Sequence, residues 1–174
     1  MTVDGEPTPR RDEGPSRAVT LILNGERVEA TVEPRLTLLD FLREHGLTGC
    51  HSGCEHGVCG ACTVLLDEQP VRACLVFAVQ AARHSVETVE GLGTADSPHP
   101  LQIAFSQERA LQCGFCTPGF LMLACGLLRA NASPTDAEIR DAVASNLCRC
   151  TGYDGIVEAV KRAASAGETV STDP

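Results

Sequence analysis

The chain has 174 residues, of which 43% are hydrophobic and 21% charged, as in a globular protein with room for one ordinary domain or two small ones. A net charge of −9 and an aromatic content of 3% argue against the basic, base-stacking surface that nucleic-acid binding needs. No apolar run approaches the roughly 20 residues that cross a membrane, and the N-terminus lacks a signal-peptide core, so we expect a cytoplasmic protein.

The N-terminal half has the pattern of a small mixed sheet. Residues 1–17 are rich in Pro, Gly and charge and are predicted to form a disordered tail. Asn24-Gly25 lies between two alternating segments and predicts a β-hairpin. Thr37 is expected to cap a short helix, and further strands are expected on both sides of residue 74. Strands with one helix between them predict an α+β domain over residues 18–92.

The C-terminal half has a helical pattern. Residues 91–100 contain two Gly and two Pro with little apolar content, and they are predicted to be a linker. The next segments alternate capping residues with apolar residues at helical spacing. They predict a four-helix bundle domain over residues 93–166, followed by a short C-terminal tail at 167–174. The helices are expected near residues 101–111, 117–128, 133–147 and 156–164.

Eight of the ten cysteines fall into two sets of four, the number of ligands that a [2Fe–2S] cluster takes when every ligand is cysteine. The first set begins with the C-x4-C-x2-C spacing of plant-type ferredoxins. Two clusters in one chain, without any other cofactor motif, predict electron transfer. The predicted ligands are Cys54, Cys59, Cys62 and Cys74 in the first set and Cys113, Cys116, Cys148 and Cys150 in the second.

Residues around both sets suit a negatively charged cluster. Gly53, Gly57 and Gly60 permit positive φ angles, so backbone N–H groups can point at the sulfur atoms. In the second set, the first two cysteines directly precede a helix that opens at Pro118. The 31 residues that separate Cys116 from the third cysteine suffice for two antiparallel helices, which would return the chain to the same end of the bundle.

The spacing of the cysteines does not by itself exclude other roles for them. Zinc also takes four thiolates; the first spacing favours iron–sulfur over zinc, whereas the second supports both equally. Disulfides are disfavoured in a reducing compartment. Cys125 lies in an apolar helix and is expected to be a core thiol, while Cys50 could be a spare thiol, a structural residue or a rival ligand. The five histidines share no ligand pattern.

Four motifs resemble those of one known family. Residues 53–65 (GCEHGVCGACTVL) and 71–75 (VRACL) resemble the N-terminal cluster motif of the small iron–sulfur subunits of molybdenum hydroxylases. Residues 112–119 (QCGFCTPG) and 146–152 (NLCRCTG) resemble the second cluster motif. The similarity extends over about residues 19–160. The family includes xanthine dehydrogenase, aldehyde oxidoreductase and carbon monoxide dehydrogenase.

The resemblance implies a β-grasp, plant-type ferredoxin domain followed by a helical [2Fe–2S] domain. It also implies two partners, a large subunit with a molybdenum–pterin cofactor and a medium subunit with FAD. Electrons would pass from molybdenum through the helical cluster and then the β-grasp cluster to FAD, with Gln112 and Cys150 facing the pterin. The chain would then be part of an oxidoreductase without performing substrate chemistry alone.

The sequence departs from the family pattern at two places. The usual Asp-Gly turn is Asp67-Glu68-Gln69 here, and Cys50 replaces a residue that is not cysteine. Neither position is a predicted ligand. Two other functions stay open, a zinc-binding scaffold or regulatory protein and a free-standing two-cluster ferredoxin. The substrate of the implied complex is not visible in this chain.

Overall fold

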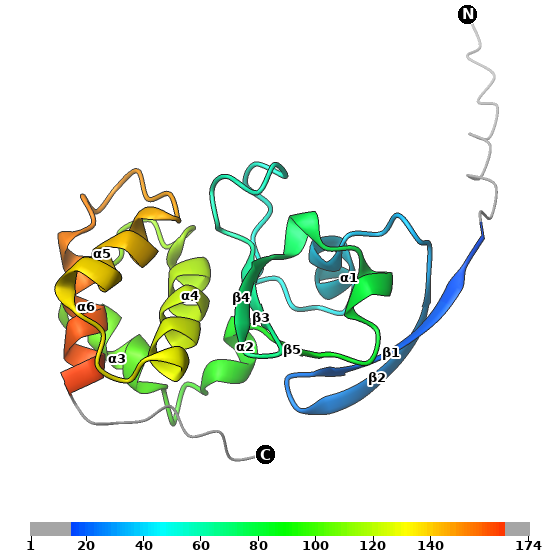
Figure 1. Cartoon of the computed structure of the whole chain (residues 1–174), viewed down its shortest axis with the longest axis horizontal. Helices are drawn as coiled ribbons and strands as arrows, with labels where there is room; N and C mark the ends of the chain where they lie inside the picture. The colour runs from blue at the N-terminus through cyan, green and yellow to red at the C-terminus, as the bar shows by residue number, and fades with distance from the viewer. Residues whose placement is uncertain (1–14, 166–174) are drawn as a thin grey trace, which may run out of the picture.

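The computed structural model describes residues 15–165, which form a sheet-containing half and a helical half lying side by side (Figure 1). The predicted tails at 1–17 and 167–174 lie outside the described residues except for positions 15–17. Arg17 already belongs to the first strand, so the sheet begins one residue before the predicted domain start at residue 18. The α+β class is confirmed, with the sheet in the N-terminal half and a bundle in the C-terminal half.

The N-terminal half contains one five-stranded mixed sheet in the order β2-β1-β5-β3-β4. Strand β1 pairs antiparallel with β2 and parallel with β5, and β3 pairs antiparallel with β4 and β5. Helix α1 shares a hydrophobic core with the sheet, which is the β-grasp arrangement. The elements are β1 (Arg17–Leu23), β2 (Glu26–Val32), α1 (Leu38–Glu44), β3 (Thr63–Leu66), β4 (Gln69–Arg72) and β5 (Ser85–Glu87).

Local sequence explains the predicted hairpin and helix. Asn24 and Gly25 both have positive φ, 50° and 84°, as the tight hairpin turn between β1 and β2 requires. Thr37 caps α1, and its hydroxyl oxygen accepts a 3.0 Å hydrogen bond from the Asp40 amide. Both predictions are confirmed.

The hairpin of β3 and β4 has a tight turn that contains no glycine. Asp67 and Glu68 both adopt left-handed conformations, at φ 46° and 67°. The Asp67 carboxylate accepts a 2.8 Å hydrogen bond from the Ser85 amide, which ties the turn to β5. Sequence patterning did not predict β4, since Pro70 lies within it. The proline is tolerated because β4 is an edge strand of the sheet.

The C-terminal half contains the four predicted helices, and a shorter helix precedes them. Helix α2 lies in the segment where the predicted linker begins, and α3 ends at Gln107, four residues earlier than predicted. The left-handed conformation of Arg109, with φ 52°, prevents α3 from continuing. The helices are α2 (Val89–Leu92), α3 (Pro100–Gln107), α4 (Thr117–Ala130), α5 (Asp136–Ala144) and α6 (Asp154–Ser165).

Helix α4 joins the two halves because it packs against the helices and also against β3 and β4. A Cβ atom at Gly126 would lie 2.5 Å from Pro70, so the missing side chain allows the helix to approach this hairpin closely. Arg129, near the end of α4, donates two hydrogen bonds of 2.7 and 2.8 Å to the Glu87 carboxylate in β5. The sheet and the bundle therefore share a packed interface.

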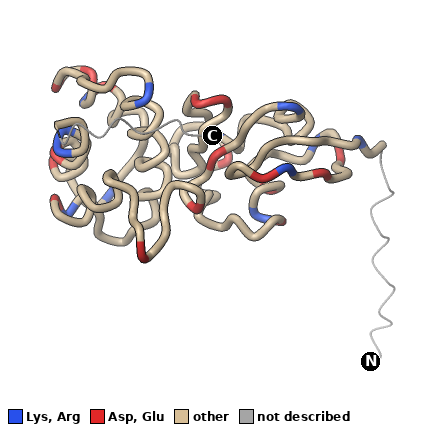
Figure 2. Tube along the Cα trace, turned by 90° about the horizontal axis from the view of Figure 1, so that it is seen from below, with Lys and Arg blue, Asp and Glu red and all other residues tan. Residues whose placement is uncertain are grey.

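The charged residues are dispersed over both halves, and Figure 2 shows Lys and Arg scattered along the trace instead of gathered on one face. Between residues 15 and 165, no helix is both long enough and apolar enough to span a membrane.

Candidate iron–sulfur sites

Three cysteines of the first set, Cys54, Cys59 and Cys62, lie in a loop between α1 and β3, and Cys74 lies in a short 3-10 turn after β4. Backbone amides of the loop point at sulfur. The amides of His56 and Cys59 donate to Cys54 Sγ at 3.4 and 3.3 Å. These two hydrogen bonds lower the pKa of the Cys54 thiol to about 6, since they favour its thiolate. The loop therefore stabilises negative charge on sulfur, as an iron–sulfur site requires.

Two of the three predicted glycines adopt positive φ in this loop. Gly57 and Gly60 have φ of 75° and 71°, which lets the backbone curl around the cysteines. Gly53 does not have a positive φ, so that part of the prediction is wrong. Its role is steric, because a Cβ atom there would lie 3.0 Å from Cys59 Sγ and 3.3 Å from the Phe115 ring.

The four thiols of the first set form two neighbouring pairs. The Cys54 and Cys59 thiols interact in the half-buried outer part of the loop, where each is the other's neighbour. The Cys62 thiol has Cys74 as its neighbour deeper in the domain, where burial raises the pKa of Cys62 to about 11. This two-plus-two arrangement is the one expected when each iron of a [2Fe–2S] core takes two protein thiolates.

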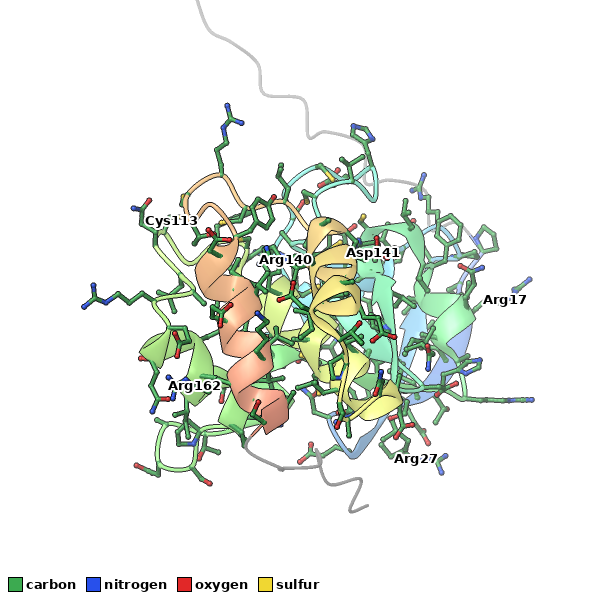
Figure 3. The ribbon with its side chains drawn as sticks, turned by 60° about the vertical axis from the view of Figure 1, so that its left-hand side comes forward. Arg17, Arg27, Cys113, Arg140, Asp141 and Arg162 are labelled. Carbon is green, nitrogen blue, oxygen red and sulfur yellow. The ribbon has the colours of Figure 1, made fainter. Side chains whose placement is uncertain are left out.

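The second set shows the same pairing at one end of the helical bundle. Cys113 and Cys150 are exposed and their Sγ atoms lie 3.6 Å apart. Cys116 and Cys148 are neighbours further inside, and burial raises the pKa of Cys116 to about 12. Figure 3 shows Cys113 at the end of the bundle where α6 begins. Cys116 is the N-cap of α4, so the positive end of that helix faces the site.

Both sites therefore suit a two-iron cluster in the number, pairing and hydrogen bonding of their thiols. Within residues 15–165, no three Cys, His, Asp or Glu side chains are arranged to hold a single metal ion. In each set, one pair of thiols lies further out and the other pair lies further in, so the four thiols form two separate pairs. Each iron would then be held by one pair of thiolates.

Two hydroxyl side chains support the second site, and sequence reasoning missed both. Thr151 Oγ1 donates to Cys148 Sγ at 3.1 Å. Burial alone would raise the pKa of the Cys148 thiol, but hydrogen bonds from the Thr151 hydroxyl and from the Cys150 and Thr151 backbone outweigh it and lower the pKa. The Tyr153 hydroxyl accepts from the Cys148 amide at 2.9 Å. Both residues lie within five positions of the predicted ligand Cys148, and this closeness in sequence was the signal that could have identified them.

A backbone hydrogen bond links the two sites directly. The Leu147 amide, next to Cys148, donates to the Cys59 carbonyl at 2.8 Å. Buried Asn146 reinforces this contact, because its side-chain amide donates to the Gly60 carbonyl at 3.2 Å. One residue adjacent to a predicted ligand of the second set is thus bonded to a predicted ligand of the first.

The remaining predicted residues have clear positions. Gln112 is exposed beside Cys113, at the outer face of the second site. Cys125 is fully buried in α4, as predicted for a core thiol. Cys50 is buried against the first site, its thiol donates to the Cys62 carbonyl at 3.5 Å, and burial raises its pKa to about 12. The Cys50 thiol therefore has a structural contact with the site.

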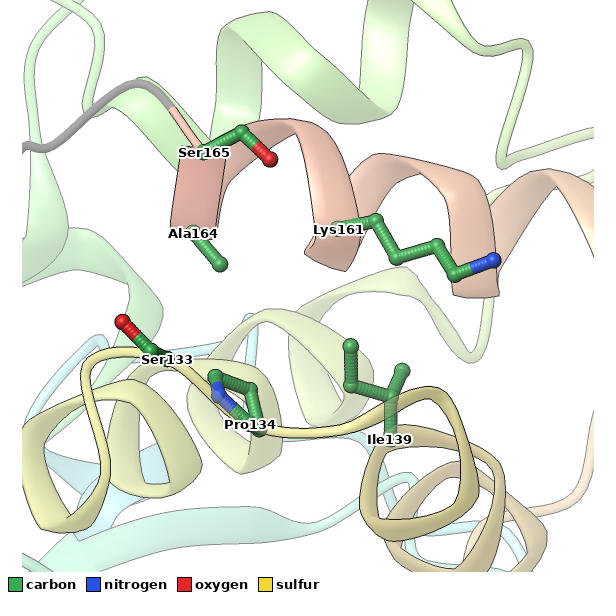
Figure 4. A pocket seen from close by; sticks show the side chains of 6 residues that line it. All are labelled: Ser133, Pro134, Ile139, Lys161, Ala164 and Ser165. Carbon is green, nitrogen blue, oxygen red and sulfur yellow. The ribbon is translucent and has the colours of Figure 1, made fainter.

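A small pocket lies between α5 and α6 at the other end of the bundle from the cysteines (Figure 4). Of the six residues that line it, Lys161 is the one with a titratable side chain, and it is already paired with Asp136 and Glu158. The pocket therefore does not offer the paired acid and base groups of a catalytic site.

Comparison with known protein families assigns each half to a cluster-binding domain. Residues 21–87 match the family model described as a 2Fe-2S iron-sulfur cluster binding domain. Residues 88–161 match the model of a [2Fe-2S] binding domain. Each model contains one of the two cysteine sets.

Similar whole proteins define the family more closely. The chain is 46% identical over 162 residues to the caffeine dehydrogenase subunit gamma of Pseudomonas sp. (strain CBB1), covering 91% of this chain and 97% of the relative. It is 55% identical over 139 residues to the nicotine 6-hydroxylase small subunit of Paenarthrobacter nicotinovorans, covering 79% and 84%. The chain belongs to the small iron–sulfur subunits of molybdenum hydroxylases. The iron–sulfur subunit is thus a component of an oxidoreductase and contains two [2Fe–2S] domains.

A solved structure agrees with this assignment. The iron–sulfur subunit matches a chain of quinoline 2-oxidoreductase from Pseudomonas putida 86 with a TM-score of 0.83 and 47% identity, covering 87% of this chain and 95% of that one. The predicted order of a ferredoxin-like domain followed by a helical domain is therefore confirmed. The individual cysteine ligands and the exact domain boundaries stay predictions.

Proposed function

We propose that the chain is the electron-transfer subunit of a molybdenum hydroxylase complex. It would carry electrons from a molybdenum–pterin site on a large partner subunit to FAD on a medium partner subunit. Each [2Fe–2S] cluster supplies a centre that gains and loses one electron. The observation that carries the proposal is the 2.8 Å hydrogen bond from the Leu147 amide to the Cys59 carbonyl, which connects the surroundings of the two sites.

The eight paired cysteines are proposed as the cluster ligands. In the first site, one iron would be held by Cys54 and Cys59 and the other by Cys62 and Cys74. In the second site, the pairs are Cys113 with Cys150 and Cys116 with Cys148. Proximity supports this division, because Cys113 and Cys150 have their Sγ atoms 3.6 Å apart and the thiols of the other three pairs influence one another's pKa as neighbours. An iron–sulfur assignment requires about four irons and four labile sulfides per chain, two of each per cluster.

Exposure supports an order for the two sites. The outer pair of the second site, Cys113 and Cys150, lies at the surface beside exposed Gln112, where a partner cofactor can approach. The inner pair lies towards the link with the first site. We infer that electrons enter at the helical site, with Gln112 offering an amide donor and acceptor to the pterin and the Cys150 sulfur accepting a weak hydrogen bond.

The first site has an apolar rim that suits the second partner. Val58 and Leu75 are 70% and 61% exposed, and Leu75 packs over Gly57 in the cluster loop. Exposed apolar side chains around a loop of this kind are typical of protein interfaces. Docking of the medium subunit here would bring FAD near the first site and complete the path.

The proposed substrate class is a nitrogen heterocycle. The relatives at 46% and 55% identity are named for caffeine and nicotine, and the matching solved structure is named for quinoline. An aldehyde oxidoreductase of Megalodesulfovibrio gigas is 43% identical. The complex should therefore oxidise one of these heterocycles faster than a simple aldehyde, as measured by steady-state assay; the opposite preference would reject the proposed class.

Two variants of one residue test the electron path. Leu147→Pro deletes the N–H that donates to the Cys59 carbonyl, whereas Leu147→Ala keeps it and trims a side chain that is 54% exposed. In the assembled complex, the proline variant should show slow reduction of the first cluster by substrate, with both clusters still visible by EPR after dithionite. The alanine variant should behave as wild type. Equal rates in the two variants would contradict this path.

A Gln112→Ala variant tests the entry point. It should slow substrate reduction of both clusters and leave their dithionite-reduced EPR spectra intact. Full-rate reduction of the first cluster in this variant would contradict the proposed order. Stoichiometric zinc in place of iron would support a scaffold function instead, and electron carriage by the isolated chain at the rate of the complex would support a free-standing ferredoxin.

A further inference from the structure

Tyr153 has a backbone conformation that is rare for an aromatic residue. Its φ is 74°, directly after Gly152 at φ 70°. Left-handed backbone places Cβ close to a carbonyl oxygen, so a bulky residue keeps it only where the surroundings impose it. Here the Tyr153 amide donates to Thr151 Oγ1 at 3.2 Å, and its ring meets Phe120 edge-on with centroids 6.2 Å apart. These contacts aim the phenol at the segment that carries Cys148.

The phenol binds the peptide groups on both sides of Leu147. Its oxygen accepts a hydrogen bond from the Cys148 amide at 2.9 Å, and its O–H donates to the Asn146 carbonyl at 3.3 Å. The Asn146 carbonyl and the Leu147 amide belong to one peptide unit. That amide donates to the Cys59 carbonyl, so Tyr153 holds the opposite end of the peptide that makes the link.

We propose that Tyr153 is the positioning residue of the link between the two cluster sites. A hydrogen bond to a peptide carbonyl polarises the peptide and strengthens donation from its N–H. The bond to the Cys148 amide also keeps that ligand at a fixed position relative to Leu147. This inference rests on the proposed function, because the link matters only if electrons pass between the sites.

A merely structural role for Tyr153 can be separated from this one. The Tyr153 carbonyl accepts a 3.0 Å hydrogen bond from the Val157 amide and so begins α6. Phenylalanine at position 153 would keep that backbone bond and the ring contact with Phe120. It would delete only the two hydrogen bonds of the phenol.

The experiment uses Tyr153→Phe in the assembled, cluster-loaded complex. The electron donor is caffeine, nicotine or quinoline, whichever the wild-type complex oxidises, and rapid-freeze EPR follows each cluster. We expect the helical cluster to be reduced at the wild-type rate and the first cluster several-fold more slowly. Arg129→Gln is the control, since it removes a contact between the two halves away from the link and should leave this rate unchanged.

Two results would overturn the inference. One is reduction of the first cluster at the wild-type rate in Tyr153→Phe, and the other is equal slowing in Arg129→Gln. If the wild-type complex itself shows no transfer from the helical cluster to the first cluster, the proposed function fails, which is a distinguishable outcome.

A measurement on the wild-type complex keeps the test independent of the variant. The Leu147 amide should exchange its hydrogen slowly although the Leu147 side chain is 54% exposed, because the amide is bonded to Cys59 and its peptide is held by Tyr153. Rapid exchange of this amide would overturn the inference even if Tyr153→Phe does not assemble.

Discussion

The two cysteine sites use different parts of the chain to support the same kind of cluster. The first site depends on backbone: left-handed Gly57 and Gly60 shape a loop whose amides point at Cys54. The second site depends on a helix start and on side-chain hydroxyls, with Thr151 bonded to the Cys148 sulfur. A loop held by its own backbone should be most sensitive to added side chains. A site held by side chains should be most sensitive to their removal.

The largest expected effect is the selective loss of one cluster. Cys62→Ser should abolish the first cluster and spare the second, and Cys116→Ser should do the reverse, because each removes one of the thiols proposed to hold that cluster's irons. Iron analysis and EPR of the dithionite-reduced protein measure this. Cys50→Ser and Cys125→Ser are the controls and should leave both spectra. Loss of the first cluster in Cys50→Ser, together with its survival in Cys54→Ser, would show that the ligand register is wrong.

Glycine substitutions test the dependence of the first site on backbone. Gly60→Ala places Cβ 2.0 Å from Asn146 Oδ1 at a left-handed residue. The conformation costs roughly 1–2 kcal/mol and the overlap typically a further 1–3 kcal/mol, so the loaded protein should unfold at clearly lower denaturant concentration. Gly114→Ala, in the second site, has a positive φ but no atom within 4 Å of its Cβ, so it bears only the conformational cost. Equal losses of stability would contradict the comparison.

The interface between the halves should contribute less than the loop geometry. Arg129 and Glu87 have side chains that are 12% and 31% exposed and share two hydrogen bonds. Replacing Arg129 with Gln should lower the free energy of unfolding by about 1–3 kcal/mol, as measured by denaturation. Arg140→Gln removes an exposed ion pair with Asp136 on α5 and should have little effect. A larger loss of stability from Arg140→Gln than from Arg129→Gln would contradict the greater contribution expected of the partly buried pair.

The smallest effect is expected at the turn between β3 and β4. Glu68 adopts a left-handed conformation, φ 67°, which favours glycine. Glu68→Gly should therefore raise the free energy of unfolding by about 0.5–1 kcal/mol, since the relief of crowding exceeds the entropy that glycine adds to the unfolded chain. Glu55→Gly is the matched control, because Glu55 is also left-handed but accepts a 2.7 Å hydrogen bond from Ser52. A stability gain at Glu55 and none at Glu68 would contradict this account.

Sequence spacing was sufficient to find the two cysteine sets, the hairpin at Asn24-Gly25 and the four helices. Such features depend on residues close together in the chain, whose preferences are local. The positive φ predicted for Gly53 was wrong, and the crowding found there instead, from Cys59 Sγ and from the Phe115 ring in the other half of the molecule, has no local sequence signal. The pairing of thiols within each set was not predicted either, because it depends on how the loop and the bundle fold.

The contacts between the halves could not be predicted from this sequence. Arg129 and Glu87 are 42 positions apart, and no local pattern connects them. Tyr153 follows a predicted ligand by three positions, yet its use depends on the left-handed conformation that directs its phenol back to Cys148. The backbone conformation of a single residue, and the direction in which it points the side chain, can be seen only in the structure.

Helix α4 begins at the second site, and its Gly119 lies against the loop of the first site, where a Cβ would fall 2.2 Å from the Gly60 carbonyl. The start of α4 is therefore packed directly against both cysteine sites. Carriers that swing one domain between docking positions are limited by diffusion of that domain. Here packing sets the distance between the two sites, so under the proposed function the rate of electron transfer between the two clusters should not depend on solvent viscosity.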